Sequence, residues 1–406
     1  MTNSISLKVT KLGPIKHADV IFDKYTVFIG NQGAGKSTLA KIFSLFVWLE
    51  KALIRHYFSE AQLCKGKFSN KEFCKYHRIT SYFKPDTEIE FKGKRYTFEY
   101  NNEKLRVTTV STAEENGQVA KVIYIPAERN LLSTIEHPRK LEDLPSSLLD
   151  FNDEYDNAKN TLNNTVGLPV NRIEFVYDKL NDISWVQGED FKTRLTEASS
   201  GFQSLVPLCL VSSYLTLRLL DKPELRLSKA DKDKLNAELE AIMSMDVRLD
   251  VKEALIKKAS AKFGYSSLVN VVEEMEQNLY PTSQKEVLFY LLNHCNSIDE
   301  NRLVLTTHSP YLINYLSLAA KAKQIASLDN FKNKSDLQEL LYNIVPKEAL
   351  LDSDKLHIYE VRPDGQTVEL EKFENLPSDD NVLNTLLGET NELFSDLYDI
   401  EEACQV

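Results

Sequence analysis

Three apolar, β-rich segments, each followed at once by polar residues, predict an α/β fold. They span residues 25–29, 267–272 and 302–307, and they lead into a glycine-rich loop, a pair of glutamates and a histidine, respectively. Ligand sites in α/β sheets form at the carboxyl ends of the strands, so we expect these polar residues to share one site. Alternating residues at 88–100 add an antiparallel β-subdomain, and charged helix formers at 219–264 add a helical insertion.

The glycine-rich loop predicts a site for a nucleoside triphosphate. Its residues are Gly30, Asn31, Gln32, Gly33, Ala34, Gly35, Lys36, Ser37 and Thr38. Glycine allows backbone N–H groups to close around phosphate oxygens, and a helix beginning near Lys36 would direct its positive end at them. Lys36 can reach the β- and γ-phosphates, and the Ser37 hydroxyl suits Mg²⁺. A chance glycine-rich turn is disfavoured because a strand precedes the loop and a helix follows it. The cofactors expected are therefore ATP and Mg²⁺.

Composition limits the broad class of the protein. The chain has 406 residues, of which 42% are apolar and 27% charged, as in an ordinary globular protein. It lacks an apolar run of about 18 residues and the basic-then-apolar start of a signal peptide, so we expect a cytoplasmic protein without a membrane partner. Its five cysteines are scattered without a Cys-x-x-Cys pair, which favours reduced thiols. The net charge of −11 argues against a protein that binds nucleic acid over its whole surface.

Hydrophobic periodicity predicts the elements of the first third of the chain. Residues 5–30 alternate as two strands around a Gly-Pro turn and continue to the glycine-rich loop. Residues 37–58 predict a long helix with a broad apolar face. Residues 88–100 have the pattern of a hairpin, and residues 121–126 that of a short buried strand.

The later segments are less regular. Residues 140–195 are polar and helix-permissive, which predicts a helical subdomain rather than a sheet. The charged residues 219–264 predict an exposed helical insertion. Residues 355–371 alternate around a Pro-Asp-Gly turn and predict a second hairpin, and the acidic C-terminal segment predicts a helix.

A basic segment, residues 51–78, raises the possibility of a local nucleic-acid contact. Its basic residues are interleaved with aromatic ones: Lys51, Arg55, Lys65, Lys67, Lys71, Lys75 and Arg78 with Tyr57, Phe58, Phe68, Phe73 and Tyr76. Such residues can follow a phosphate backbone or stack on bases. The stronger interpretation is a solvated helical insertion whose aromatic residues belong to the core. A zinc site at His56, Cys64, Cys74 and His77 is a further alternative, although the spacing matches no standard zinc pattern.

Two glutamates and a histidine are the candidates for metal binding and catalysis. Glu273 and Glu274 end an apolar strand, where a P-loop nucleotidase places the carboxylate that holds its metal ion and the base that activates the attacking water. Glu273 is the candidate Mg²⁺ ligand, through water, and Glu274 the candidate general base. His308 ends the next buried strand and could contact the γ-phosphate or orient the water.

At this point the chain resembles the ABC-type ATPases. The resemblance is carried, in chain order, by Walker A at 30–38, a signature-like loop at 199–204, Walker B at 269–274, a D-loop region at 276–281 and the switch histidine His308. The most similar branch includes RecF, OLD and SMC proteins and the ATPase subunits of bacterial anti-phage systems such as Septu, retron-linked PtuA and PARIS. The resemblance implies the head of an ABC ATPase, a P-loop NTPase, as the fold.

The resemblance also implies how the site is completed. In such a family ATP is held between Walker A of one subunit and the signature loop of another, which assigns ATP contacts to Ser200, Gly201 and Gln203 in a head-to-tail homodimer or larger homo-oligomer. The family usually has two glycines where this chain has Gly201-Phe202. A glutamine of the Q-loop is missing, and the run Tyr-Ile-Pro-Ala-Glu-Arg lies where that loop belongs. Glu128 or Arg129 would then sense the nucleotide, or form a structural ion pair.

Family resemblance implies an ATPase that acts as a sensor or regulator of a separately encoded effector, often a nuclease, in phage defence. The chain after His308 lacks the acidic clusters of a Toprim nuclease and an HNH arrangement, so we expect no nuclease activity from this chain alone. The effector would dock on 140–195 or 219–264. The alternatives are a DNA-repair or chromosome-maintenance ATPase that binds DNA directly, and a nucleotide-gated scaffold with little turnover.

The predicted organisation has four parts. Residues 1–135 form an N-terminal ATPase lobe with Walker A and a basic insertion at 51–84. Residues 136–218 form a helical subdomain with the signature-like loop, and 219–266 a charged helical insertion. Residues 267–406 form a C-terminal ATPase lobe with Walker B, the switch histidine, a hairpin and a helix.

Overall fold

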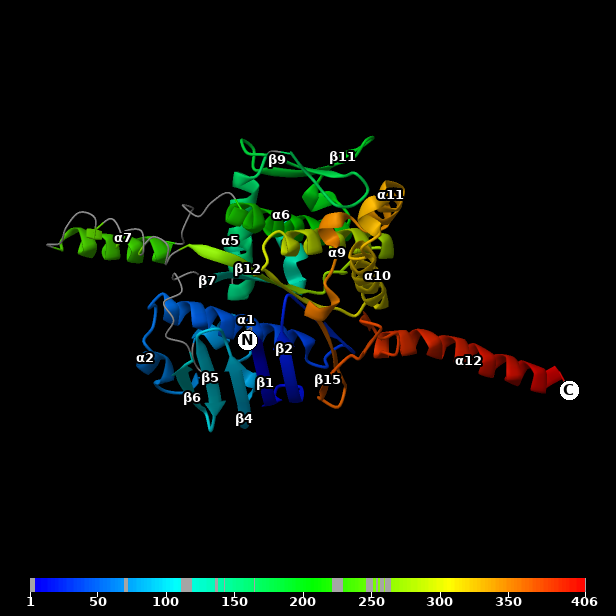
Figure 1. Ribbon diagram of the computed structural model, residues 1–406, viewed down its shortest axis with the longest axis horizontal. Helices are drawn as coiled ribbons and strands as arrows, with labels where there is room; N and C mark the ends of the chain where they lie inside the picture. The colour runs from blue at the N-terminus through cyan, green and yellow to red at the C-terminus, as the bar shows by residue number, and fades with distance from the viewer. Residues whose placement is uncertain are drawn as a thin grey trace.

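In its described part, the computed structural model contains four sheets, three of four to six strands and one of two short strands, with helices packed between the larger sheets (Figure 1). It describes residues 4–68, 72–110, 119–135, 138–141, 143–163, 165–220, 229–245, 251–252, 255, 259 and 264–405. Helix α7 extends from one end of the molecule and helix α12 from the other (Figure 1). The predicted α/β fold with an antiparallel β-subdomain is confirmed.

A mostly parallel sheet forms the centre. Its order is β15-β14-β3-β13-β12-β7, and all neighbours are parallel except the edge pair β14 and β15. The strands are β3 (Tyr25–Ile29), β7 (Val119–Ile125), β12 (Tyr265–Glu273), β13 (Arg302–Thr306), β14 (Leu356–Val361) and β15 (Thr367–Glu369). The three predicted strands with polar ends therefore lie side by side and run in one direction, which brings their carboxyl ends to one edge. The predicted hairpin at 355–371 is confirmed as β14 and β15.

Helix α1 (Lys36–Ile54) lies between the central sheet and an antiparallel N-terminal sheet. That sheet has the order β2-β1-β4-β5-β6, with β1 (Ile5–Leu12), β2 (Ile15–Phe22), β4 (Phe83–Lys92), β5 (Tyr96–Asn101) and β6 (Lys104–Thr109). Aromatic residues fill the layer, as where the Phe43 ring of α1 stacks 3.8 Å from that of Phe22. A helix between two sheets buries both of its sides, which explains why the apolar face predicted for residues 37–58 is so broad.

The predicted helical subdomain is wrong in part. Helices α4 (Leu131–Thr134), α5 (Ser146–Thr161) and α6 (Ser200–Leu220) are present, but an antiparallel sheet separates the last two: β8 (Thr165–Gly167), β9 (Glu174–Asp178), β10 (Ile183–Gln187) and β11 (Lys192–Arg194). The strands have only three to five residues, and their buried side chains are Phe175 and Tyr177 of β9 and Val186 of β10, so exposed and half-exposed residues dominate the composition. The side chain of Asp178 accepts hydrogen bonds from Leu180 and Asn181, which forms the β9–β10 turn.

The remaining helices cover the other face of the central sheet or extend from it. They are α7 (Lys229–Met243), α9 (Pro281–Asn296), α10 (Pro310–Ala326), α11 (Ser335–Ile344) and α12 (Val382–Gln405). The short helices α2 (Glu60–Cys64) and α3 (Glu72–Tyr76) follow α1, and the strands β16 (Lys372–Phe373) and β17 (Leu376–Pro377) precede α12. Of the described helices, α6 alone is long and apolar enough to cross a membrane, and 72% of its apolar window is buried inside the structure.

Candidate functional site

The predicted phosphate-binding loop joins β3 to α1, with α1 beginning at Lys36. Two of its glycines are required by their surroundings. Gly30 has a φ of 135°, and a Cβ atom there would lie 2.2 Å from the carbonyl oxygen of Val361. Gly35 has a φ of 119°, and a Cβ atom there would lie 2.3 Å from the side chain of Ile15. Both conformations are accessible to glycine and strained for other residues, so the loop shape is built into the sequence.

Lys36 is folded back onto its own loop. Its Nζ donates to the carbonyl oxygens of Gly30 at 2.8 Å and Asn31 at 2.9 Å, and it lies 3.3 Å from His308 Nδ1. The side chain is only 4% exposed, so in this conformation Lys36 is buried in its own loop, and its contact with phosphates stays a prediction. Burial lowers the pKa of the ammonium to about 8, against the opposing effect of Glu274 and Glu276.

His308 connects Lys36 to Glu274. The Nδ1 atom of His308 faces the Lys36 ammonium, and its Nε2 atom faces Glu274. That nitrogen lies 3.5 Å from Glu274 Oε1. The interaction with His308 is the main reason why the pKa of Glu274 is below its usual value. The three predicted residues Lys36, Glu274 and His308 therefore meet at the carboxyl ends of β3, β12 and β13.

The backbone at the end of β12 holds Glu274 in an unusual conformation. Its φ is 44°, and its N–H donates to the carbonyl oxygen of Thr306 at 2.9 Å. A positive φ in a residue other than glycine costs free energy and persists where the surroundings enforce it. The adjacent Glu276, which sequence reasoning did not single out, accepts a hydrogen bond from the His308 N–H at 2.6 Å and so fixes the histidine as well.

Glu273 is the last residue of β12, directly before Glu274, and it is buried, with an exposed fraction of 3%. Its Oε2 accepts from the Ala127 N–H at 3.3 Å, whereas Oε1 has no hydrogen-bond partner among the described residues. The hydroxyl of Tyr124 is likewise buried without one. Burial and the nearby Glu273 carboxylate hold the pKa of Tyr124 well above its usual value. Carboxylate and hydroxyl oxygens are ligands that suit Mg²⁺, so Glu273 and the half-buried Ser37 fit the predicted magnesium site by their chemistry.

Arg129 is fully buried, and its guanidinium is bound by backbone carbonyl groups. Nη1 donates to Glu273 at 2.7 Å and Nη2 to Glu274 at 2.7 Å, while Nε donates to Ser204 of α6 at 3.2 Å. The structural ion pair considered for this residue is not what the described residues show. Glu128 is exposed beside it. Arg129, which lies where a Q-loop is expected, thus links the Walker B segment to α6. Its role in sensing the nucleotide stays a prediction.

The signature-like loop forms the start of α6. Ser200 is exposed, and a Cβ atom on Gly201 would lie 2.8 Å from the carbonyl oxygen of Asn278, so glycine is required there by the D-loop region. Asn278 also donates to Ser204 Oγ at 3.2 Å. Gln203 is turned inward, with its amide donating to the carbonyl oxygen of Thr196 at 3.1 Å. Ser200 and Gly201 are therefore the predicted contacts that remain at the surface.

The basic segment 51–78 is mostly structural in its described part. Phe68 is fully buried and stacks on Phe46 at 5.9 Å, so it is unavailable for nucleic-acid bases. Lys67 pairs with Glu103 at 2.9 Å. Within the described residues there is no cluster of three potential metal ligands, and Cys74 is buried in the core, which argues against the zinc alternative. Lys71 lies outside the described residues, and nucleic-acid binding stays a prediction.

Comparison with known proteins gives similarity of fold only. No family model matches the sequence, and no curated protein matches it. The structure is similar to the SMC head domain from Thermotoga maritima (TM-score 0.37, 11% identity, 91% of this chain and 100% of that chain). It is similar to an Smc head with an extended coiled coil bound to the C-terminal domain of ScpA from Pyrococcus furiosus (0.35, 9%, 98% and 100%). It is also similar to the ADP conformation of an ATP-binding cassette of an ABC transporter (0.31, 12%, 91% and 92%). The functional argument therefore rests on the residues gathered at the ends of β3, β12 and β13.

Proposed function

We propose that the protein binds and hydrolyses ATP with Mg²⁺. The observation that carries this proposal is that His308 lies between Lys36, at 3.3 Å, and Glu274, at 3.5 Å. The three side chains meet beside a glycine-rich loop that leads into a helix. This arrangement offers an ammonium group and backbone N–H groups that can bind phosphates, and a carboxylate that can activate an attacking water.

Each side chain has a role that follows from its position. Lys36 leaves the carbonyl oxygens of Gly30 and Asn31 to contact the terminal phosphates. Glu274, half exposed and kept ionised by His308, accepts the proton of the attacking water at Oε1. Ser37 and Glu273 would hold the magnesium ion, which when bound neutralises phosphate charge.

We infer that hydrolysis requires a second subunit. Ser200 and Gly201 lie at the surface at the start of α6, where backbone N–H groups and a helix N-terminus can complete the cage around a γ-phosphate held by another protomer. A head-to-tail homodimer would thus form with ATP and open after hydrolysis, which converts nucleotide state into a conformational switch.

For the biological role, we propose a cytoplasmic sensor or regulator of a separately encoded effector, a nuclease, in anti-phage defence. The support is the resemblance of the motif runs at 11–39, 124–129, 273–281 and 306–316 to defence ATPases. The alternative is an SMC-like or RecF-like ATPase that binds DNA directly. A nuclease, reverse transcriptase or toxin gene beside this one, and loss of phage resistance in a Glu274→Gln strain, would support the first role.

The biochemical test uses Glu274→Gln, which retains the shape of the side chain but not the base. This variant should bind ATP, hydrolyse it at least about a hundredfold more slowly, and accumulate as a dimer in ATP but not in ADP. Light scattering and phosphate release measure the two effects. Hydrolysis at the parent rate would place the base elsewhere and contradict the proposed site.

A further inference from the structure

Helix α12 extends from the body of the protein with an exposed apolar face. It spans Val382–Gln405, about 36 Å at 1.5 Å per residue, and projects from one end of the molecule (Figure 1). Asn381 caps its first turn, with Oδ1 accepting from the Leu383 N–H at 3.2 Å. Further along, six large apolar side chains are between 44% and 65% exposed: Leu386, Leu393, Phe394, Leu397, Tyr398 and Ile400. A contiguous exposed apolar surface of this kind marks a contact with a partner.

The six side chains form an apolar stripe that is wider than the seam of a coiled coil. At about 100° per residue they fall within an arc of about 160°. One row has heptad spacing and consists of Leu386, Leu393, Leu397 and Ile400. A second row, Phe394 and Tyr398, lies beside it. One facing helix would cover the first row and leave the two rings in water, so the stripe fits a groove that contacts α12 on both sides.

The charges of α12 have a single sign. Residues 382–405 include six acids and no Lys, Arg or His. Of the acids that the structure describes, Glu401 falls within the stripe, in the last turn, and the others are exposed beside or behind it: Glu389, Glu392, Asp396 and Asp399. Basic side chains at the rim of a groove would pair with these acids. Anionic lipid surfaces and nucleic acid attract basic segments, so the charge of α12 favours a protein partner.

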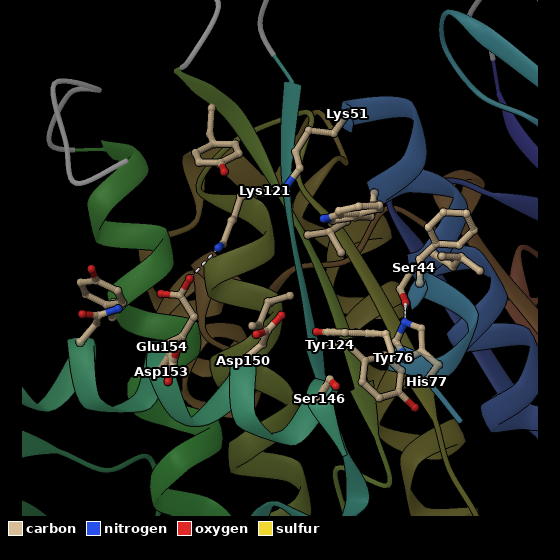
Figure 2. Close-up of a pocket in the computed structure, with 18 of the residues that line it drawn as sticks. Ser44, Lys51, Tyr76, His77, Lys121, Tyr124, Ser146, Asp150, Asp153 and Glu154 are labelled. Carbon is tan, nitrogen blue, oxygen red and sulfur yellow. Dashed lines mark hydrogen bonds and ion pairs between the residues drawn. The ribbon is translucent and has the colours of Figure 1, made fainter. Parts of the chain in front are cut away.

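A second copy of this chain does not complement α12. Two α12 helices would bring only acids together at their edges, in a parallel or an antiparallel pair. The groove of about 880 Å³ beside β7 has three basic and three acidic side chains in its lining, so its charges balance. It is also crossed by a hydrogen bond between Tyr76 and Asp150, and Lys121 there pairs with Glu154 at 2.5 Å (Figure 2).

We propose that α12 docks its apolar stripe into an apolar groove, rimmed by Lys or Arg side chains, on a partner protein other than a copy of this chain. Burial of the stripe supplies the affinity, and the acids set the orientation and the rate of encounter. Residues 382–405 lie outside the segments 140–195 and 219–264, where docking is expected from the sequence. The proposal does not depend on ATP hydrolysis.

Photocrosslinking in the cells that naturally produce the protein identifies the contact. The photoreactive residue p-benzoylphenylalanine replaces Phe394 or Tyr398 in the stripe and, as the control, the exposed Ser395 on the opposite face. Mass spectrometry of the crosslinked peptides locates the attachment sites. We expect both stripe positions to react with one protein, at apolar residues flanked by Lys or Arg, and position 395 to leave that protein unlabelled.

Matched variants test the contact with that protein after purification. Leu397→Glu should lower the affinity, measured by calorimetry, by at least about tenfold. Ser395→Glu adds the same charge to the opposite face and should change the affinity by less than about threefold. Asp396→Asn should weaken the dependence of the affinity on salt.

Parent-like thermal melts and ATP hydrolysis confirm that these variants are folded. The proposal is overturned if the stripe positions crosslink to a second copy of this chain or to nothing, or if the attachment sites lack basic neighbours. Parent-like affinity of Leu397→Glu would overturn it as well.

Discussion

Arg129 donates to the backbone carbonyl oxygens of both Walker B glutamates, at 2.7 Å from Nη1 to Glu273 and 2.7 Å from Nη2 to Glu274. The same guanidinium reaches Ser204 in α6 at 3.2 Å. Glu274 has a φ of 44°, and this clamp is one of the constraints that hold it there.

Replacing Arg129 by lysine should therefore damage catalysis more than binding. Lysine keeps the charge but cannot reach, from its single ammonium group, the four carbonyl groups of Pro126, Ser204, Glu273 and Glu274 that the planar guanidinium binds. We expect kcat to fall by about tenfold or more while the Kd of ATP changes by less than about threefold, because Arg129 lies behind the carboxylates. Phosphate-release kinetics and calorimetry measure the two constants. A parent-like kcat, or equal losses in both constants, would contradict a positioning role.

Lys36→Met should abolish nucleotide binding at little cost to stability. The methionine retains the apolar stem, and the lowered pKa of Lys36 shows that burial opposes its charge. The free energy of unfolding without ATP should change by about 1 kcal/mol or less, since the loss of two carbonyl contacts is offset by removal of a buried charge. Thermal melts with and without Mg-ATP test this. A variant that ATP still stabilises would refute the phosphate-binding assignment of Lys36.

The pKa of Lys36 also predicts how ATP binding depends on pH. In the free protein the ammonium loses its proton as pH rises through about 8, well below the ordinary value of 10.5, and ATP binding restores it. ATP affinity should therefore weaken above about pH 8, with proton uptake detected by calorimetry in buffers of different ionisation enthalpy. Stability without nucleotide should instead gain from pH rising between about 8 and 10.5, where the unfolded chain binds more protons. Lys36→Arg, which keeps its charge, serves as the control. Proton uptake unchanged in that control would show that another group titrates.

The basic segment gives a prediction about nucleic acid. Charge reversal at Lys67, Lys71 and Lys75 should weaken any DNA binding and lower its salt slope, because fewer counterions are released. A salt titration with labelled duplex DNA measures this slope.

The parent protein, incubated with plasmid or tRNA and Mg²⁺ or Mn²⁺, should cut neither nucleic acid. Metal-dependent cleavage that survives Glu274→Gln would reveal a nuclease site and overturn the regulatory role.

The catalytic edge of the sheet was predictable because its signals are local. Glu274 and His308 lie just after buried strands, and Lys36 follows another one across the glycine-rich loop; parallel strands bring such positions together. The sheet at 165–194 was not predicted because its strands are short and polar on one face. The inward turn of Lys36 and the role of Arg129 depend on contacts between distant segments, which no local pattern encodes.

The contacts of helix α6 would couple the two ATP sites of a dimer. Its first turn exposes Ser200, which we propose contacts a neighbouring protomer, while Arg129 and Asn278 bind Ser204, about one turn further on, and so link it to the Walker B and D-loop segments of its own protomer. In a head-to-tail dimer, the loop that closes one ATP site is thus joined mechanically to the base of the other. The two turnovers would then be cooperative, with a Hill coefficient above unity that Arg129→Lys reduces.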